Sequence, residues 1–111
     1  MTRRGDVWLV DFGSPVGREQ AGIRPAVVVS TYRHNEGLSG VLMVVPLTTS
    51  RRGLPSHIEI EPGASGLDSV SYAKCEDLKS ISLERLVHRE GAIEPRSLLE
   101  IGRSLAFLLE L

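Results

Sequence analysis

Residues 25–30 read PAVVVS, and the three consecutive valines predict a buried central β-strand. Pro25 stands at the first position of this strand, where a missing N–H group costs least. The preceding residues 13–23 are rich in glycine and predict a long loop. Loops of this length without structure of their own are often functional, so the loop before this strand is a candidate functional segment.

Further apolar runs on both sides of this strand predict a β-rich fold. The expected strands are 7–12, 41–45, 57–61, 69–76 and 87–93, with Pro46 ending the third strand of the chain and polar loops at 31–39 and 48–55. Ser82 is expected to cap a short helical turn over 83–86. After Pro95, apolar residues recur at helical spacing and predict an amphipathic helix that docks on the sheet through Leu98, Ile101, Leu105 and Leu108. Short strands followed by one terminal helix predict a mainly β architecture, as a strongly bent sheet or small barrel.

Length and composition place the chain among ordinary globular proteins. It has 111 residues, 41% hydrophobic and 24% charged, which predicts one domain over residues 1–111 with a real core. Cys75 is the only cysteine, so no internal disulfide can form, and a buried thiol in a reducing compartment is expected. No signal peptide is recognised, and the uncharged stretch 38–50 is too short to span a bilayer, so the sequence predicts a cytoplasmic protein.

The charge distribution favours an anion site in the first half of the chain. The formal net charge is −1, but residues 1–52 hold seven arginines against four acids, a net of +3. Residues 53–111 hold six basic residues against ten acids, a net of −4. An anion would therefore bind the N-terminal half, although chance clustering on a solvated surface explains the asymmetry equally well.

Standard metal and catalytic motifs are absent from the sequence. His34, His57 and His88 are far apart, and a single cysteine rules out a cysteine cluster. There is no glycine-rich phosphate loop followed by lysine and no nucleophile elbow. These patterns predict no metal and no cofactor.

The order of several short blocks resembles one known family. The blocks are Gly5-Asp6-Val7-Trp8, Val10-Asp11-Phe12, 17–30 (GREQAGIRPAVVVS), Val45-Pro46-Leu47-Thr48-Thr49, Gly53-Leu54-Pro55, Asp68-Ser69-Val70 and Leu78-Lys79-Ser80-Ile81. Together they resemble the MazF/PemK (Kid) family of toxin endoribonucleases, also called mRNA interferases. The most specific string is Glu-Gln-Ala-Gly-Ile-Arg-Pro at 19–25, whereas many folds share the pattern of the terminal helix.

The resemblance implies a fold, an activity and partners. It implies an SH3-like β-barrel of the CcdB/MazF type with a C-terminal helix, forming a homodimer. It implies the toxin of a type II toxin–antitoxin system that cuts single-stranded RNA, mRNA above all, at a short sequence and so inhibits translation and growth. The RNA's own 2′-hydroxyl would be the nucleophile, without a metal, and a MazE-like antitoxin would cover the RNA groove.

Three residues are the catalytic candidates that the resemblance implies. Arg24 would stabilise the phosphate charge, because a guanidinium is always charged and grips phosphate oxygens in a fork. Thr48 would donate its hydroxyl to the same phosphate, or else simply bond the backbone of its own turn. Glu19 would accept the 2′-hydroxyl proton or orient Arg24, or else be a solvated loop acid.

The sequence departs from some relatives at two places. Ile23 stands where some relatives carry a histidine that could move protons, so a required base must come from elsewhere. Lys74 and Glu76 stand where some carry a catalytic arginine and aspartate, and lysine lacks the fork. Lys74 and Glu76 are therefore RNA-binding candidates, with an ordinary exposed pair as the alternative.

The remaining RNA-binding candidates are aromatic or polar. Tyr72 is expected to stack on a base, whereas Trp8 is expected in the core or at a dimer interface. The polar candidates for contact with the RNA are Arg18, Gln20, Thr49, Arg51 and Arg52. Three phosphate contacts of this kind would give a log–log salt slope near −2 on a single strand.

Two rival functions stay open at this point. A gyrase-poisoning toxin of the CcdB type shares the barrel, but such toxins end in Trp-Gly-Ile and this chain ends in Leu108-Leu109-Glu110-Leu111. A catalytically silent paralogue that only binds RNA or a partner is the second alternative, and the isoleucine at position 23 keeps it open.

Overall fold

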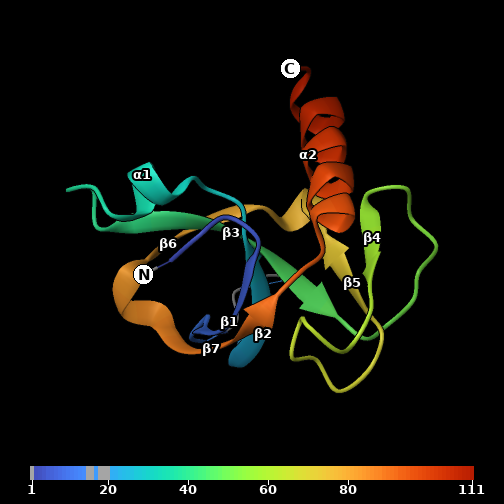
Figure 1. Cartoon of the computed structure of the whole chain (residues 1–111), viewed down its shortest axis with the longest axis horizontal. Helices are drawn as coiled ribbons and strands as arrows, with labels where there is room; N and C mark the ends of the chain where they lie inside the picture. Colours follow the sequence, from blue (N-terminus) through green and yellow to red (C-terminus); the bar gives the residue numbers. More distant parts are fainter. Residues whose placement is uncertain (1, 15–16, 18–20) are drawn as a thin grey trace.

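An antiparallel β-sheet dominates the computed structural model, which describes residues 2–14, 17 and 21–111 (Figure 1). Its strands are β1 (Asp6–Asp11), β2 (Ile23–Val28), β3 (Val41–Thr48), β4 (His57–Ile60), β5 (Ser71–Lys74), β6 (Lys79–Ser82) and β7 (Leu86–Ala92). The order across the sheet is β4-β5-β3-β2-β1-β7, and β6 pairs with the first half of β3. Short helical segments are α1 (Tyr32–Asn35), η1 (Cys75–Asp77) and η2 (Leu83–Arg85), and the long C-terminal helix is α2 (Pro95–Leu109). The mainly β fold with a C-terminal helix is confirmed.

The alternation of side chains along each strand divides the core into two clusters. Val27 on β2 is fully buried in the first cluster, beneath α2, whereas its neighbours Ala26 and Val28 are buried in the second cluster on the opposite face. The first cluster is Val7, Val27, Val45, Leu47, Ile60, Ala73, Cys75, Ile93 and Ile101. The second is Val10, Phe12, Ala26, Val28, Leu42, Val44 and Ile81. Burial on both faces explains why the central strand is an unbroken apolar run.

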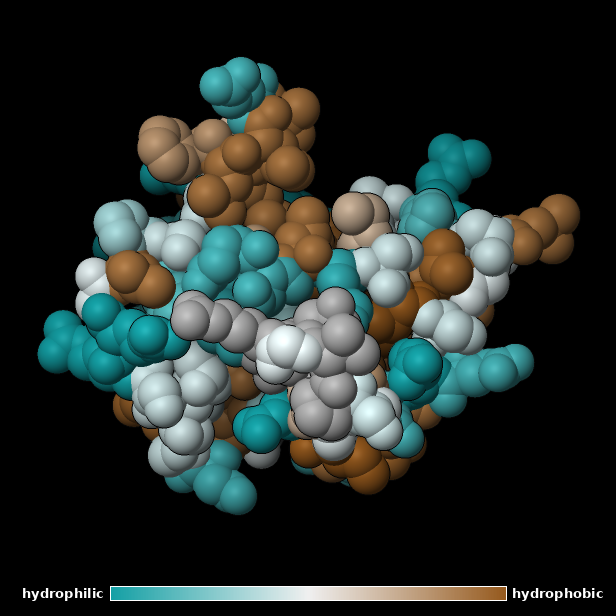
Figure 2. Space-filling model, turned by 180° about the vertical axis from the view of Figure 1, so that it is seen from behind, coloured by the Kyte–Doolittle hydropathy of each residue, from teal (hydrophilic) through white to brown (hydrophobic). Residues whose placement is uncertain are grey.

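Helix α2 follows the predicted pattern for most of its length. Pro95 occupies its first turn, Ile101 is fully buried, and Leu98 and Leu105 pack against the first cluster. Leu108 was also expected to dock, but 40% of it is exposed, because the last turns of α2 extend past the sheet (Figure 1). Figure 2 shows a hydrophobic surface at the top of the molecule, where α2 ends. Phe107 and Leu109, in the last turns of this helix, are exposed as well.

The structure corrects the expected end of β3. Pro46 was expected to stop this strand, yet β3 continues to Thr48. On one side, β3 pairs with β6 as far as Val44 and with β5 from Leu47 onward. Pro46 lies between the end of the pairing with β6 and the start of the pairing with β5. A residue without an N–H group is tolerated at such a break in the pairing.

Other boundaries differ from the sequence prediction by a few residues. The segment 31–39 was expected to be a loop, but Thr31 caps the helix α1 by accepting a hydrogen bond from the backbone N–H of His34. The strand expected over 69–76 is shorter, and its last part is the turn η1. Strand β6 was not predicted at all, whereas the turn capped by Ser82 and the half-exposed strand β4 are confirmed.

Two glycines permit the close approach of β7 to the turn after β4. A Cβ atom on Gly91 would lie 2.2 Å from the carbonyl oxygen of Ala64, and one on Gly66 would lie 2.1 Å from that of Glu90. Gly66 also has a φ of +76°, a conformation that side chains disfavour. The pairing of β7 with this turn therefore depends on glycine at both positions.

The structure also bears on the predicted buried cysteine and on membrane-spanning helices. Cys75 is buried, as expected, and desolvation raises the pKa of its thiol, which makes it a poor nucleophile. Among the described helices, none is both long and apolar enough to cross a membrane.

Candidate functional site

A row of polar side chains crosses four neighbouring strands. Ala26 of β2 pairs with Pro46 of β3, so Arg24 and Thr48, each two residues away along its own strand, lie on the same face of the sheet. Thr48 pairs with Tyr72 of β5, which in turn pairs with Glu59 of β4. Side chains of directly opposed residues lie on the same face of an antiparallel sheet. The row Arg24–Thr48–Tyr72–Glu59 therefore lies on one face, opposite to α2.

Arg24 presents a charged group at the start of this row. It is exposed, and its Nε–H donates a hydrogen bond to the carbonyl oxygen of Ala21 at 2.9 Å. Among the described residues, no carboxylate pairs with its guanidinium within 4.0 Å. The backbone contact fixes one nitrogen and leaves the Nη groups to face an anion.

Thr48 ends β3 with its hydroxyl in a defined orientation. Its Oγ1 accepts a hydrogen bond from the backbone N–H of Ser50 at 3.2 Å, so the turn bond considered from the sequence is present. A hydroxyl that accepts in this way can still donate its own proton. Both roles considered for Thr48 are therefore compatible, and the turn bond orients the oxygen.

A groove of about 260 Å³ adjoins the Tyr72 and Glu59 end of the row. Its lining residues are Arg51, Gly53, Leu54, Pro55, His57, Glu59 and Tyr72. The groove contains a basic residue, Arg51, and an aromatic ring, that of Tyr72, beside residues of strand β4. A base stacked on the ring and its phosphate would fit such a surface. Arg51 lines this groove, whereas Arg52 and Thr49 are exposed in the neighbouring loop and do not line it, and the RNA contacts of all three stay predictions.

Lys74 and Glu76 make internal contacts with different partners. The Lys74 ammonium lies 3.1 Å from the Asp77 carboxylate. One Glu76 oxygen lies 2.7 Å from Nε2 of His57, and the other accepts a hydrogen bond from the Ser56 hydroxyl at 2.8 Å. Each of the two side chains therefore contacts a residue other than its partner in the predicted pair, and their role in RNA binding stays a prediction.

Partial burial raises the pKa of Glu76, but hydrogen bonds from His57, its own backbone and Ser56 outweigh that effect. The net pKa is below the ordinary value of 4.5. A carboxyl whose pKa is lowered by folding contributes stability above the unfolded pKa, and this contribution is lost as the pH falls through the folded value.

Replacing Glu76 by glutamine should therefore lower the free energy of unfolding at neutral pH, by less than about 1 kcal/mol because the carboxylate itself is 37% exposed. The difference from the wild-type protein should shrink as the pH falls below 4.5 and the carboxyl takes up a proton. Urea denaturation of both proteins across this range measures the effect. A difference that grows in acid would contradict the assignment.

The other residues singled out from the sequence stand before β2 in the chain, next to Arg24, or on β1. Glu19, Arg18 and Gln20 lie outside the described residues, so their predicted roles stay predictions. Ile23 is 60% exposed beside Arg24 and pairs with Asp11. Trp8 is half-buried against the second cluster, as expected for a core position.

Sequence reasoning missed His57 and Glu59 at the groove. The available signal was the alternation of β4, whose apolar Ile58 and Ile60 face the first cluster and leave His57 and Glu59 on the other face. The partner of His57 is 19 residues away in sequence, and no local pattern indicates that contact.

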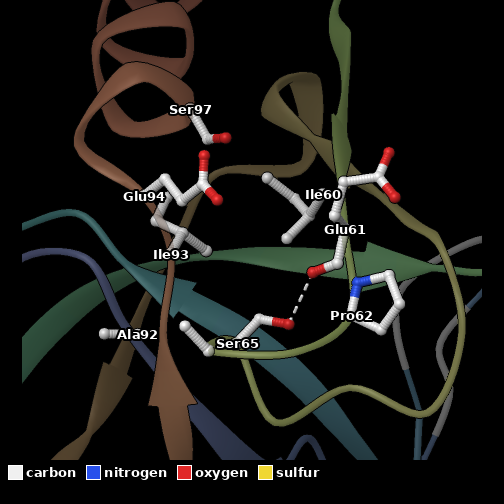
Figure 3. Close-up of a pocket in the computed structure, with 9 residues that line it drawn as sticks. Ile60, Glu61, Pro62, Ser65, Ala92, Ile93, Glu94 and Ser97 are labelled. Carbon is white, nitrogen blue, oxygen red and sulfur yellow. Dashed lines mark hydrogen bonds between the residues drawn. The ribbon is translucent and has the colours of Figure 1, made fainter.

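A second cavity, of about 30 Å³, lies between the turn after β4 and the start of α2 (Figure 3). Ile60 and Ile93 form its apolar walls, and the Ser65 hydroxyl donates a hydrogen bond to the carbonyl oxygen of Glu61 at 2.7 Å. Its volume suits about one water molecule. Among the described residues, no group of three histidine, cysteine or acidic side chains could hold a metal ion.

Comparison with known protein families identifies the family to which the chain belongs. Residues 3–109 match the family described as PemK-like, MazF-like toxin of type II toxin-antitoxin system. The chain belongs to this family. The MazF-like resemblance inferred from the sequence blocks is thereby confirmed, and it extends through the C-terminal helix.

Relatives of this MazF-like toxin cover its whole length. Endoribonuclease MazF9 of Mycobacterium tuberculosis is 34% identical over 100% of the chain and 98% of its own length. Endoribonuclease MazF of Staphylococcus saprophyticus is 30% identical over 100% of the chain and 93% of its own length.

Solved structures of related proteins have the same fold. MazF from Deinococcus radiodurans has a TM-score of 0.82 at 27% identity, over 100% of this chain and 97% of that one. An endoribonuclease from a mycobacterial species, solved in complex with its cognate antitoxin, has a TM-score of 0.83 at 25% identity with the same coverage. The MazF-like barrel is therefore confirmed.

Proposed function

We propose that this MazF-like toxin is an endoribonuclease that cuts single-stranded RNA through the RNA's own 2′-hydroxyl, without a metal ion. The row that joins Arg24 and Thr48 beside the groove carries the proposal. The 2′-oxygen attacks the adjacent phosphorus, the bond from phosphorus to the 5′-oxygen breaks, and that oxygen takes a proton. The products are a 2′,3′-cyclic phosphate and a 5′-hydroxyl.

Charge stabilisation is the part of this reaction that Arg24 performs. Negative charge gathers on the two non-bridging phosphate oxygens during in-line attack, and a fixed cation there lowers the barrier. The contact between Arg24 and Ala21 holds the guanidinium before the substrate arrives. A donor that needs no reorganisation stabilises the transition state more than a mobile surface charge does.

Thr48 donates its hydroxyl to the same phosphate. Replacing it by valine should keep the strand and lower the single-turnover cleavage rate about 10- to 100-fold, the scale of one hydrogen bond to a charged group. Thr48→Ser should recover most of the rate, because it restores the hydroxyl. A folded Thr48→Val protein that cuts at the wild-type rate would exclude this role.

The proton acceptor for the 2′-hydroxyl is assigned to Glu19, on the resemblance alone. Ile23 cannot move a proton, so the histidine that some relatives place there has no counterpart at this position. A carboxylate in the loop next to Arg24 is close in sequence to the phosphate site. Glu19→Gln should therefore reduce the rate mainly through the proton-transfer step.

The RNA chain follows the row from Arg24 toward the groove. Tyr72 stacks on a base next to the cut, and Arg51 at the groove wall contacts the backbone. Arg18, Gln20, Thr49 and Arg52 add contacts to the flanking nucleotides. Lys74 and Glu76 adjoin the groove through His57, which pairs with Lys74 across the sheet and contacts the Glu76 carboxylate.

Partners and setting follow from the same proposal. The chain, as one domain over residues 1–111, forms a homodimer, and the exposed hydrophobic end of α2 supports a protein interface. A MazE-like antitoxin lies over the RNA groove and blocks it. The toxin acts in the cytoplasm on mRNA and so inhibits translation and growth, while the family match sets aside the gyrase-poisoning alternative.

Cleavage of a long RNA by the purified protein in excess EDTA tests the proposal. We expect discrete cuts whose fragments carry a 2′,3′-cyclic phosphate and a 5′-hydroxyl. Binding of the RNA without any cutting would favour the silent paralogue instead. Cutting that stops with the chelator and returns with Mg²⁺ would contradict the metal-free reaction.

A further inference from the structure

His57 is a buried polar side chain with one unpartnered nitrogen. Only 3% of the side chain is exposed, and its Nε2 lies 2.7 Å from Glu76. Its Nδ1 is buried and has no hydrogen-bond partner among the described residues. Leaving such a group unpaired destabilises the free protein, and an unpartnered buried polar atom in a native fold calls for an explanation.

The contact with Glu76 determines what Nδ1 offers to a ligand. Glu76 is held ionised by its hydrogen bonds, and Ser56 fixes the other carboxylate oxygen at 2.8 Å. A carboxylate only accepts hydrogen bonds, so the neutral ring must carry its proton on Nε2. In the neutral ring Nδ1 then has a bare lone pair and acts as an acceptor.

The position of His57 separates it from the phosphate at Thr48. It lies on β4, opposite Lys74 and two residues from Glu59, and it lines the groove with Tyr72. Since neighbouring strands are about 4.8 Å apart, β4 is roughly 10 Å from β3. A hydrogen bond cannot cover that distance, so His57 faces a neighbouring nucleotide rather than the phosphate being cut.

We propose that His57 determines sequence specificity by accepting, at Nδ1, a hydrogen bond from an N–H group on a nucleobase beside the scissile bond. This rests on the proposed RNA-cleaving function. The base stacks on Tyr72 and directs an amino or imide N–H toward the ring. Entry of the base requires a shift of the groove wall, where Leu54 and Pro55 lie in an exposed loop.

Glu76 and Ser56 are positioning residues in this arrangement. Without the carboxylate, the ring can move its proton to Nδ1 and present a donor instead of an acceptor. The preferred base would then change at the same nucleotide. The charged residues that line the groove beside His57 are Glu59 and Arg51. Lys74, which pairs with His57 across the two strands, lies 3.1 Å from the Asp77 carboxylate.

The test is the cleavage profile on a randomised RNA library, read by sequencing the ends. In His57→Leu the ratio of cleavage rates between the preferred base and the other bases at one nucleotide flanking the cut should fall about 5- to 100-fold. This is the range expected when the N–H group of the base is left without a partner. Preferences at the other positions should stay. Glu76→Gln, which keeps the histidine, should change the preference at that same nucleotide and covers the case in which His57→Leu does not fold.

The matched control is His88→Leu, at an exposed histidine on β7, which should reproduce the wild-type profile. A second experiment uses an RNA in which the base at that nucleotide lacks the N–H donor. Wild type should then cut more slowly while His57→Leu does not. A folded His57→Leu protein with an unchanged profile, or with an equal loss at every site, would overturn the inference. Failure of the wild-type protein to cut any RNA would instead reject the function on which it rests.

Discussion

Arg24→Ala should lower the single-turnover cleavage rate by about 10²–10³-fold, the scale for losing one preorganised donor at a developing charge. The side chain is exposed and leaves the core untouched, so the variant should fold normally. Its loss removes the only group assigned to the non-bridging oxygens besides the Thr48 hydroxyl. Rapid-quench kinetics with a short labelled RNA at saturating enzyme measures the chemical step.

Two further variants separate charge from geometry in this experiment. Arg24→Lys keeps the charge but loses the fork, so it should recover only part of the rate. Arg96→Ala removes an arginine that is 88% exposed on α2, on the other side of the sheet, and should cut at the wild-type rate. Near-normal cleavage by folded Arg24→Ala would remove Arg24 from the mechanism.

Ile101→Ala should lower the free energy of unfolding by about 2–5 kcal/mol, the usual cost of emptying a buried aliphatic site. Ile101 is fully buried where α2 meets the first cluster, and its removal leaves a cavity between helix and sheet. The helix itself is not weakened, because alanine is the best helix former. Urea denaturation followed by circular dichroism measures the change.

Leu38→Ala is the control for that experiment. Leu38 is fully exposed in the turn between α1 and β3, and its truncation should change stability by no more than about 0.5 kcal/mol. Equal effects of the two substitutions would mean that α2 does not dock through Ile101. The assignment of the first cluster would then be wrong.

The sequence predicted the fold wherever the side-chain pattern is local. The valines of β2 and the helical spacing of α2 both indicate burial directly, and both elements are found. Strand β6 was missed because Lys79, Ser80 and Ser82 are polar and only Ile81 faces the core. Such a strand is stabilised by its pairing with β3, a tertiary effect that local propensity does not encode.

The candidate site was predictable only in part. The resemblance singled out Arg24 and Thr48, but their alignment in one row depends on the register between β2 and β3. The register also adds Glu59, which no motif indicated. The contact between His57 and Glu76 depends on how β4 and η1 pack against each other. The sequence alone therefore did not indicate that His57 belongs to the site.

RNA with a single 2′-deoxy sugar tests the central claim most directly. The modified sugar stands at the cut nucleotide, and the phosphate, the bases and every protein contact except that hydroxyl stay the same. We predict that cutting at that bond stops while a second, unmodified site on the same oligonucleotide is cut at its usual rate. Continued scission at the deoxy position would show that another nucleophile attacks the phosphate, which contradicts this account of the toxin.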